Sequence, residues 1–240
     1  MLLRDADWPQ INALRAEIEK YTPASVEDAG QHFSSTFVGA FSSIVLARVF
    51  MVLPFEELPA REQSFARMLV SDDTRLGKRT PVLSLIGTSG REPSWNRRQS
   101  SNGHLAIPLL DKAFVGETPM IAKLLADLQL DLAPLDDGFA ATTSKMLGSE
   151  SGKFYVADAA TAKDARDRFV IPSRAFVSKY DVHTVFGMGG SYYDGKLAVA
   201  IFFTNEIITR LVADRFASFI STFRTITTRL QQQKKIFAAA

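Results

Sequence analysis

Two apolar runs separated by a polar turn, within residues 182–204, constrain the fold of this chain most strongly. The turn is Tyr193-Asp194-Gly195-Lys196, and the runs on both sides of it are rich in β-branched and aromatic residues. This pattern is typical of a β-hairpin. We therefore expect two antiparallel strands, at about 182–190 and 196–204.

The first of these strands carries Gly187, Gly189 and Gly190, which raises the alternative of a phosphate-binding loop. Such a loop needs glycines that open a helix whose N–H groups point at the anion. Here a second strand follows, without a Lys-Ser or Lys-Thr pair, so we interpret the glycines as bulge and turn residues at the edge of the sheet. The Gly87–Gly90 segment does not fit a G-x-S-x-G nucleophile elbow, and we expect a turn at a strand end there.

Apolar spacing along the rest of the chain predicts alternating helices and strands. The expected helices cover residues 8–20, 29–42, 56–70, 118–132, 136–152 and 172–180, and the expected strands cover 43–53, 80–90, 105–110 and 153–161. A long amphipathic helix is expected from 205 to 237. The predicted fold is α/β (α+β), with a central antiparallel sheet, helices packed on it, and amphipathic helices at both ends.

Composition excludes several classes of protein. The 240 residues are 46% hydrophobic and 22% charged, as expected of a single globular domain, and the net charge of +2 does not predict binding to nucleic acid. The absence of cysteine excludes disulfides, thiolate metal sites and cysteine nucleophiles. No secretory signal and no apolar run of roughly 20 residues is present, so we expect a cytoplasmic protein without membrane insertion.

The order of segments resembles the second half of a GAF domain. It runs from FYVADAAT through SRAFVSKY to DVHTVFGMGGSYYDGKLAVAIFF and a long helix, with Asp194-Gly195-Lys196-Leu197 at the family's hairpin turn. SIVLARVFMVL and VLSLIGTSG look like strands of the first half, so the resemblance covers about residues 30–230. It implies a GAF/PAS-like sensory module that binds a small molecule, or simply dimerises, and relays a signal through its terminal helices to an output domain.

On this resemblance, residues 1–28 form an N-terminal helical arm, 29–205 a GAF-like sensory core, and 206–237 a C-terminal signalling and dimerisation helix. Residues 238–240 look like a cloning remnant or a truncation point. The apolar stripe of the last helix continues through Phe223, Ile226 and Leu230, past the expected end of the core. Apolar residues beyond a globule need a partner, so we expect a homodimer.

A small-molecule site is normally an apolar cavity with a few polar groups. The candidate ligand-binding residues are Phe154, Tyr155, Asp158, Phe186 and Met188 on the strands, with Trp95, Arg97 and His104 from a loop that could cover them. The aromatic candidates could equally be plain core. Alternation does not show which face of strand 182–190 looks into the pocket, because a slip of one residue reverses it.

The leading hypothesis is a non-catalytic sensory domain for an unidentified small molecule. Its three histidines, His32, His104 and His183, are too dispersed for a local metal motif, and no cofactor is assigned. Without cysteine, the covalent bilin attachment and the methionine sulfoxide reductase chemistry implied by the resemblance are excluded in their usual form. One alternative is a small-molecule enzyme using His104, His183 or Asp158 as acid or base; another is a ligand-free dimerisation module with a filled core.

Overall fold

A computed structural model describes residues 1–101, 103–129 and 152–238. The helix expected at 136–152 falls almost entirely outside the described residues. Six strands form one sheet in which every neighbouring pair is antiparallel, in the order β3-β2-β1-β6-β5-β4. The strands are β1 (Ile44–Pro54), β2 (Pro81–Gly90), β3 (Ala106–Pro108), β4 (Gly152–Val156), β5 (Thr184–Ser191) and β6 (Leu197–Thr204). The predicted antiparallel α+β fold and its 182–204 hairpin are confirmed.

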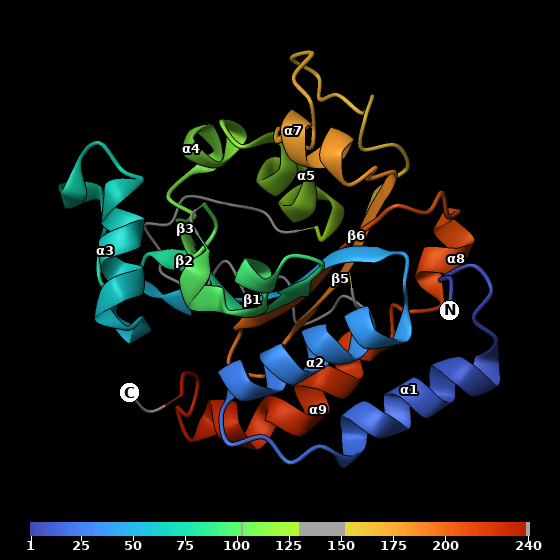
Figure 1. Ribbon diagram of the computed structural model, residues 1–240. Helices are drawn as coiled ribbons and strands as arrows, with labels where there is room; N and C mark the ends of the chain where they lie inside the picture. The colour runs from blue at the N-terminus through green and yellow to red at the C-terminus, as the bar shows by residue number, and fades with distance from the viewer. Residues whose placement is uncertain (102, 130–151, 239–240) are drawn as a thin grey trace.

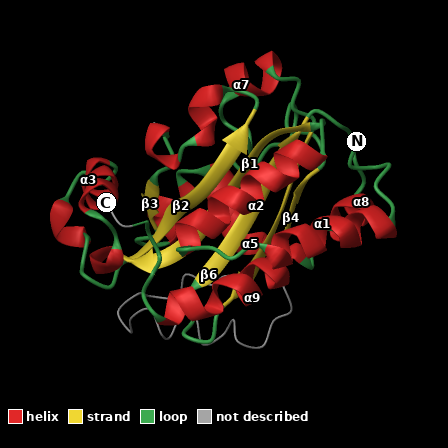
Figure 2. Ribbon diagram, turned by 60° about the horizontal axis from the view of Figure 1, so that its bottom comes forward, coloured by secondary structure: helices red, strands yellow, loops and turns green. Residues whose placement is uncertain are grey.

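Helices cover both faces of this sheet (Figure 1). One layer contains α1 (Trp8–Lys20), α2 (Val26–Ala40) and α9 (Phe219–Gln232), and the opposite layer contains α4 (Lys112–Gly116), α5 (Pro119–Asp127) and α7 (Arg174–Lys179). The other α-helices of the described residues are α3 (Ala60–Met68), beyond the β2 and β3 side of the sheet, and α8 (Arg210–Asp214), which precedes α9. Figure 2 shows α2 lying across the strands.

Each face of the sheet has its own hydrophobic cluster, because side chains alternate between the faces of a strand. We call the cluster beneath α1, α2 and α9 the helix-side cluster, and the one beneath α5 and α7 the cavity-side cluster. On β6, Phe202 belongs to the helix-side cluster, whereas Ile201 and Phe203 belong to the cavity-side cluster. Strand β6 therefore contacts both layers through alternate residues.

The expected single helix over 205–237 is wrong. The chain forms α8 and α9 with a turn over residues 215–218 between them. Phe216, in this turn, and Phe219 both pack on Phe37, with ring centroids 6.3 and 4.9 Å away. Both rings are fully buried in the helix-side cluster, so the chain interrupts its helix without exposing either of them.

The apolar stripe of the last helix does not extend beyond the globule, as the sequence had suggested. Phe223 is fully buried in the helix-side cluster, and Ile226 and Leu230 pack against it. Helix α1, which begins with a capping box between Asp7 and Gln10, belongs to the same cluster. The division of the chain at residues 28 and 205 and the homodimer stay predictions, but the stripe no longer supports a partner, because α1, α2 and the sheet cover it.

The glycines of β5 are not bulge, turn or edge residues. Strand β5 lies between β4 and β6 and pairs with both in regular register, and among the glycines of the described residues only Gly195, in the turn, has a positive φ. A Cβ on Gly187 would stand 2.6 Å from the Ala200 carbonyl oxygen, and one on Gly190 would stand 3.0 Å from the Arg224 side chain. Close packing, rather than turn geometry or phosphate binding, requires glycine in this strand.

The expected turn at Gly87–Gly90 is also wrong, because β2 continues through Gly90, paired with β1. Helix α2 crosses β2 so closely that a Cβ on Gly87 would lie 2.1 Å from the Gly30 carbonyl carbon. Among the described helices, none is long and apolar enough to cross a membrane.

Candidate ligand-binding site

A cavity of about 280 Å³ lies between the sheet and the layer that contains α5 and α7. It is lined by Leu46, Arg48, Phe50, Trp95, His104, Met120, Ile121, Ile171, Pro172, Ser173, Phe176, Ile201 and Phe203. Most of this lining is aliphatic or aromatic, and the polar exceptions are Arg48, His104 and Ser173. An apolar enclosure with a few polar groups has the composition of a small-molecule site.

The floor of the cavity comes from the two central strands. Leu46, Arg48 and Phe50 alternate along β1, and Ile201 and Phe203 alternate along β6. Because β1 and β6 pair directly, these five side chains form one continuous surface on the cavity side of the sheet.

An aromatic wall closes one side. Trp95, on the short 3-10 helix over Pro93–Asn96, meets Phe176 of α7 edge to face at 5.6 Å, and Phe176 meets Phe203 in the same way at 5.4 Å. Trp95 can lie against the end of β2 because Gly90 has no side chain; a Cβ there would stand 2.8 Å from the indole. Such edge-to-face pairs are a favoured geometry, so this wall is preorganised.

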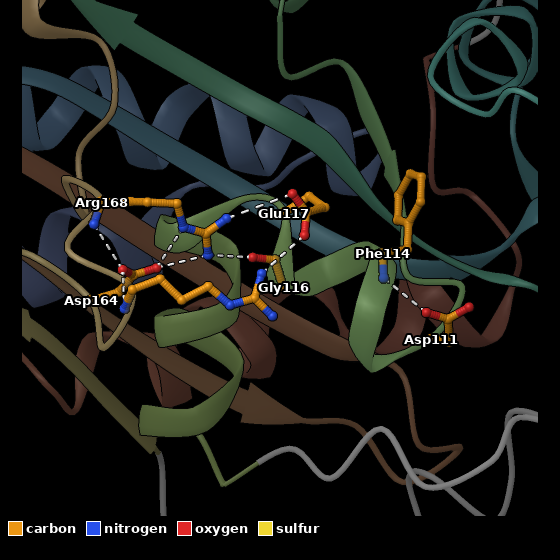
Figure 3. Close-up of polar contacts among 7 residues, drawn as sticks. Asp111, Phe114, Gly116, Glu117, Asp164 and Arg168 are labelled. Atoms are coloured by element: carbon orange, nitrogen blue, oxygen red, sulfur yellow. Dashed lines mark hydrogen bonds and ion pairs between the residues drawn. The ribbon is translucent and has the colours of Figure 1, made fainter.

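A second part of the lining, Ile171-Pro172-Ser173, follows a polar network in the loop before α7 (Figure 3). Arg168 donates to Asp164 at 2.7 Å and to the Gly116 carbonyl at 2.5 Å, and it lies 3.7 Å from Glu117. These contacts join the loop to the end of α4, next to α5. They hold the segment that carries Ile171 and Ser173 in place over the sheet.

Arg48 is the one cation of the cavity floor. The side chain is half-buried; its Nε is buried without a hydrogen-bond partner, and no ion pair or hydrogen bond joins it to the described residues. Burial lowers the pKa of Arg48 to about 10, and no neighbouring carboxylate offsets this effect. At neutral pH the cavity therefore contains a partly desolvated positive charge with no counter-ion among the described residues.

His104 borders the same cavity from the loop before β3. His104 is exposed, yet desolvation by the protein atoms around its ring, the larger cause, and the nearby charge of Arg48 lower its pKa to about 4. At neutral pH the imidazole is uncharged and offers one N–H donor and one acceptor nitrogen.

The cavity includes Trp95 and His104, two of the eight residues expected from the sequence. Arg97 is exposed on the same loop and does not line it. Phe154 is buried in the cavity-side cluster under α5, outside the lining. Asp158 lies in the turn after β4, where its carboxylate accepts from the Thr161 hydroxyl at 2.6 Å and from the Ala160 N–H at 2.8 Å.

The other three expected residues lie on the far side of the sheet. Phe186 and Met188 are buried in the helix-side cluster, and Tyr155 packs against that cluster while its hydroxyl donates to the Ile208 carbonyl at 2.7 Å. The sequence left the inward face of β5 open, and the structure shows that these side chains face α2 and α9. The cause is the register of the strand, which turns alternate residues away from the cavity.

Sequence reasoning missed Arg48 as a site residue, although a signal was present. Within SIVLARVFMVL it is the single charged residue of an otherwise apolar strand. A charged residue in a buried strand requires a partner or a cavity. The contributions of α5 and α7, such as Ile121 and Phe176, have the appearance of ordinary core residues and carry no comparable signal.

The residues of the enzyme alternative do not converge on this cavity. His104 borders it, whereas Asp158 and His183 do not, and the His183 Nε2 lies 3.3 Å from Asp181. Hydrogen bonds, first of all from Thr161, lower the pKa of Asp158, which makes it a poor general base. In the described parts of the chain, no group of three or more His, Cys, Asp or Glu residues could hold a metal ion.

No protein-family model and no curated protein matches this chain. Solved structures that match include the phycocyanobilin-bound GAF domain from a cyanobacterial phytochrome, with 10% identity, a TM-score of 0.47, and coverage of 93% of this chain and 94% of that one. The phycoerythrobilin-bound GAF domain from a cyanobacterial phytochrome matches with 10% identity, a TM-score of 0.44 and the same coverage.

The GAF domain from an Acinetobacter phosphoenolpyruvate-protein phosphotransferase matches with 9% identity and a TM-score of 0.46, covering 95% of this chain and 97% of that one. At these TM-scores the likeness says nothing about what the cavity holds. The chain is similar to GAF domains along nearly its whole length, in agreement with the resemblance seen in its sequence.

Proposed function

We propose that this protein is a non-catalytic sensory domain that holds a small molecule in the cavity between the sheet and α5 and α7. The observation that carries the proposal is the cavity itself, with its apolar lining, its aromatic wall and a cation with no partner among the described residues. A ligand with an apolar body would bury surface against Trp95 and Phe176, and the hydrophobic effect would supply most of its affinity.

A signal from this cavity would have to cross the sheet, because the terminal helices α1 and α9 pack on its other face. Strand β6 is suited to this relay. Its Phe203 borders the cavity, while the adjacent Phe202 contacts the Phe37 ring at 4.6 Å, and Phe37 contacts Phe219 of α9 at 4.9 Å. We infer that a ligand-induced shift of β6 would move α9, and through it an attached or partner output domain.

Native mass spectrometry of the purified protein tests the binding proposal. We expect a bound small molecule in the wild type and its loss in Ile201→Phe, whose larger ring would occupy the cavity. Ile207→Phe is the matched control, since Ile207 is 71% exposed and lies outside the lining. A wild type that carries no small molecule, and takes none up from a metabolite extract, would refute the proposal. The same spectra report the oligomeric state and so test the predicted homodimer.

A further inference from the structure

The position of Arg48 narrows the chemistry of the molecule that the cavity can take. Arg48 is the middle one of three alternating β1 residues on the cavity floor, between Leu46 and Phe50, and it is paired with Ile201 of β6 and Thr88 of β2. This half-buried guanidinium has lost part of its water contacts, and its Nε is buried without a hydrogen-bond partner among the described residues. Pairing with an anion should therefore release more free energy at Arg48 than at a fully hydrated surface arginine.

We propose that the ligand is a small organic acid whose single carboxylate pairs with Arg48, an inference that rests on the proposed ligand-binding function. A planar guanidinium matches a carboxylate through two parallel hydrogen bonds. One arginine neutralises one negative charge, so a monocarboxylate leaves no excess charge in the apolar cavity. A phosphate monoester would bring close to two charges at pH 7 to a cavity whose lining supplies one cation.

His104 and Ser173 are the other polar groups of the lining. Because His104 is neutral at physiological pH, it does not compete with Arg48 as a second cation, and it can donate one N–H to the same anion or to a polar group on the ligand body. The volume of about 280 Å³ lies just below the range typical of drug-sized ligands, roughly 300–1,000 Å³. These features predict a compact acid with one ring or a branched aliphatic chain.

Matched acids and amides test this inference, because an amide keeps the shape of the acid and removes its charge. The pairs are phenylacetate and phenylacetamide, 3-phenylpropanoate and its amide, indole-3-acetate and its amide, and 4-methylpentanoate and its amide, with phenyl phosphate as a dianionic comparison. Affinities are measured by calorimetry or ligand-observed NMR on ligand-free protein. In at least one pair we expect the acid to bind about tenfold more tightly than the amide, or better.

Arg48→Met should lower the affinity of the acid to that of the amide and leave the affinity of the amide unchanged. Arg97→Met is the matched control, since Arg97 is exposed on the adjacent loop and outside the lining, and it should keep the preference for the acid. If Arg48→Met does not fold, the affinities of the wild type for the acids and their amides test the inference without it.

The failures of the two proposals are distinguishable. Acids and amides that bind equally well to the wild type would overturn the carboxylate inference and leave the cavity as a binding site. A preference for acids that survives in Arg48→Met, or tighter binding of phenyl phosphate than of every acid, would also overturn it. If no acid and no amide binds with a Kd below about 1 mM, although native mass spectrometry shows a small molecule bound to the wild type, the carboxylate inference is overturned and the binding function stands.

Discussion

Replacing Arg48 with methionine should stabilise the ligand-free protein, although it removes the residue proposed to anchor the ligand. Methionine has a similar length and no charge, and it would bury its thioether among Leu46, Phe50 and the aromatic wall. The substitution removes a desolvated cation that has no partner among the described residues. Binding residues that destabilise an empty site are common, because the ligand supplies the missing interaction.

The pKa of Arg48 sets the size of the effect. Its decrease from 12.5 to about 10 corresponds to roughly 3 kcal/mol of disfavoured charge, at about 1.36 kcal/mol per pH unit. Since this pKa lies below that of the unfolded chain, the cost is fully present below about pH 10, and therefore at pH 7. Relaxation and water in the cavity reduce it, so we expect a gain of about 1–3 kcal/mol. For a chain of this size the thermal midpoint should rise by about 2–10 °C.

Arg98→Met is the contrasting variant, because Arg98 is buried and ion-paired with two glutamates. Its Nε lies 2.7 Å from Glu27, and its guanidinium also pairs with Glu62, whose side chain is 2% exposed. Removing Arg98 leaves the Glu62 carboxylate buried without a counter-charge. Breaking a buried pair in this way costs about 3–5 kcal/mol, so the thermal midpoint should fall.

Thermal and urea unfolding of the wild type and both variants, at pH 7 on protein that native mass spectrometry shows to be ligand-free, measures the two changes. We expect shifts of opposite sign, because Arg98 has ion-pair partners and Arg48 has none among the described residues. A fall in the midpoint of Arg48→Met comparable to that of Arg98→Met would refute it, because Arg48 would then have a stabilising partner. An added acid ligand should stabilise the wild type but not Arg48→Met.

Three further predictions concern glycine packing, the protonation of His104 and the aromatic wall. Gly87→Ala should lower the urea midpoint, because its Cβ would lie 2.1 Å from the Gly30 backbone. The control is Gly39→Ala on α2, whose Cβ meets nothing within 4 Å, so this variant should be neutral or stabilised by up to about 1 kcal/mol. Equal urea midpoints for the two variants would contradict the prediction. As the pH falls from 6.5 to about 4, His104 takes up a proton in the unfolded chain before it does so in the native state, so the free energy of unfolding should decrease over this range. If His104→Gln leaves the dependence of this free energy on pH unchanged, His104 does not contribute to it. Trp95→Ala should weaken binding of indole-3-acetate by about tenfold or more by removing the aromatic wall, while the exposed Trp8→Ala should leave calorimetric affinity unchanged.

Most strands and helices could be predicted from local pattern. Alternating apolar runs and the Asp194-Gly195 turn act between near neighbours, so the hairpin, the short edge strand at 105–110 and the helices before and after the sheet were predictable. The errors came where segments distant in sequence meet. The close approach of α2 to β2 at Gly87, and the packing of Phe216 and Phe219 on Phe37, depend on contacts between segments far apart in the sequence.

The residues of the candidate site also include some that local sequence predicts and others that only tertiary packing brings together. Trp95 and His104 could be predicted as pocket residues because they lie in a polar loop after a buried strand, and the lone charge of Arg48 in an apolar strand was a readable signal. Because side chains alternate along a strand, the sequence predicts that Phe186 and Val185 lie on opposite faces of the sheet. It does not predict which helical layer covers each face. Only the packing of α5 and α7 on one face, and of α2 and α9 on the other, decided where the cavity lies and brought residues 48, 104 and 173 to its wall.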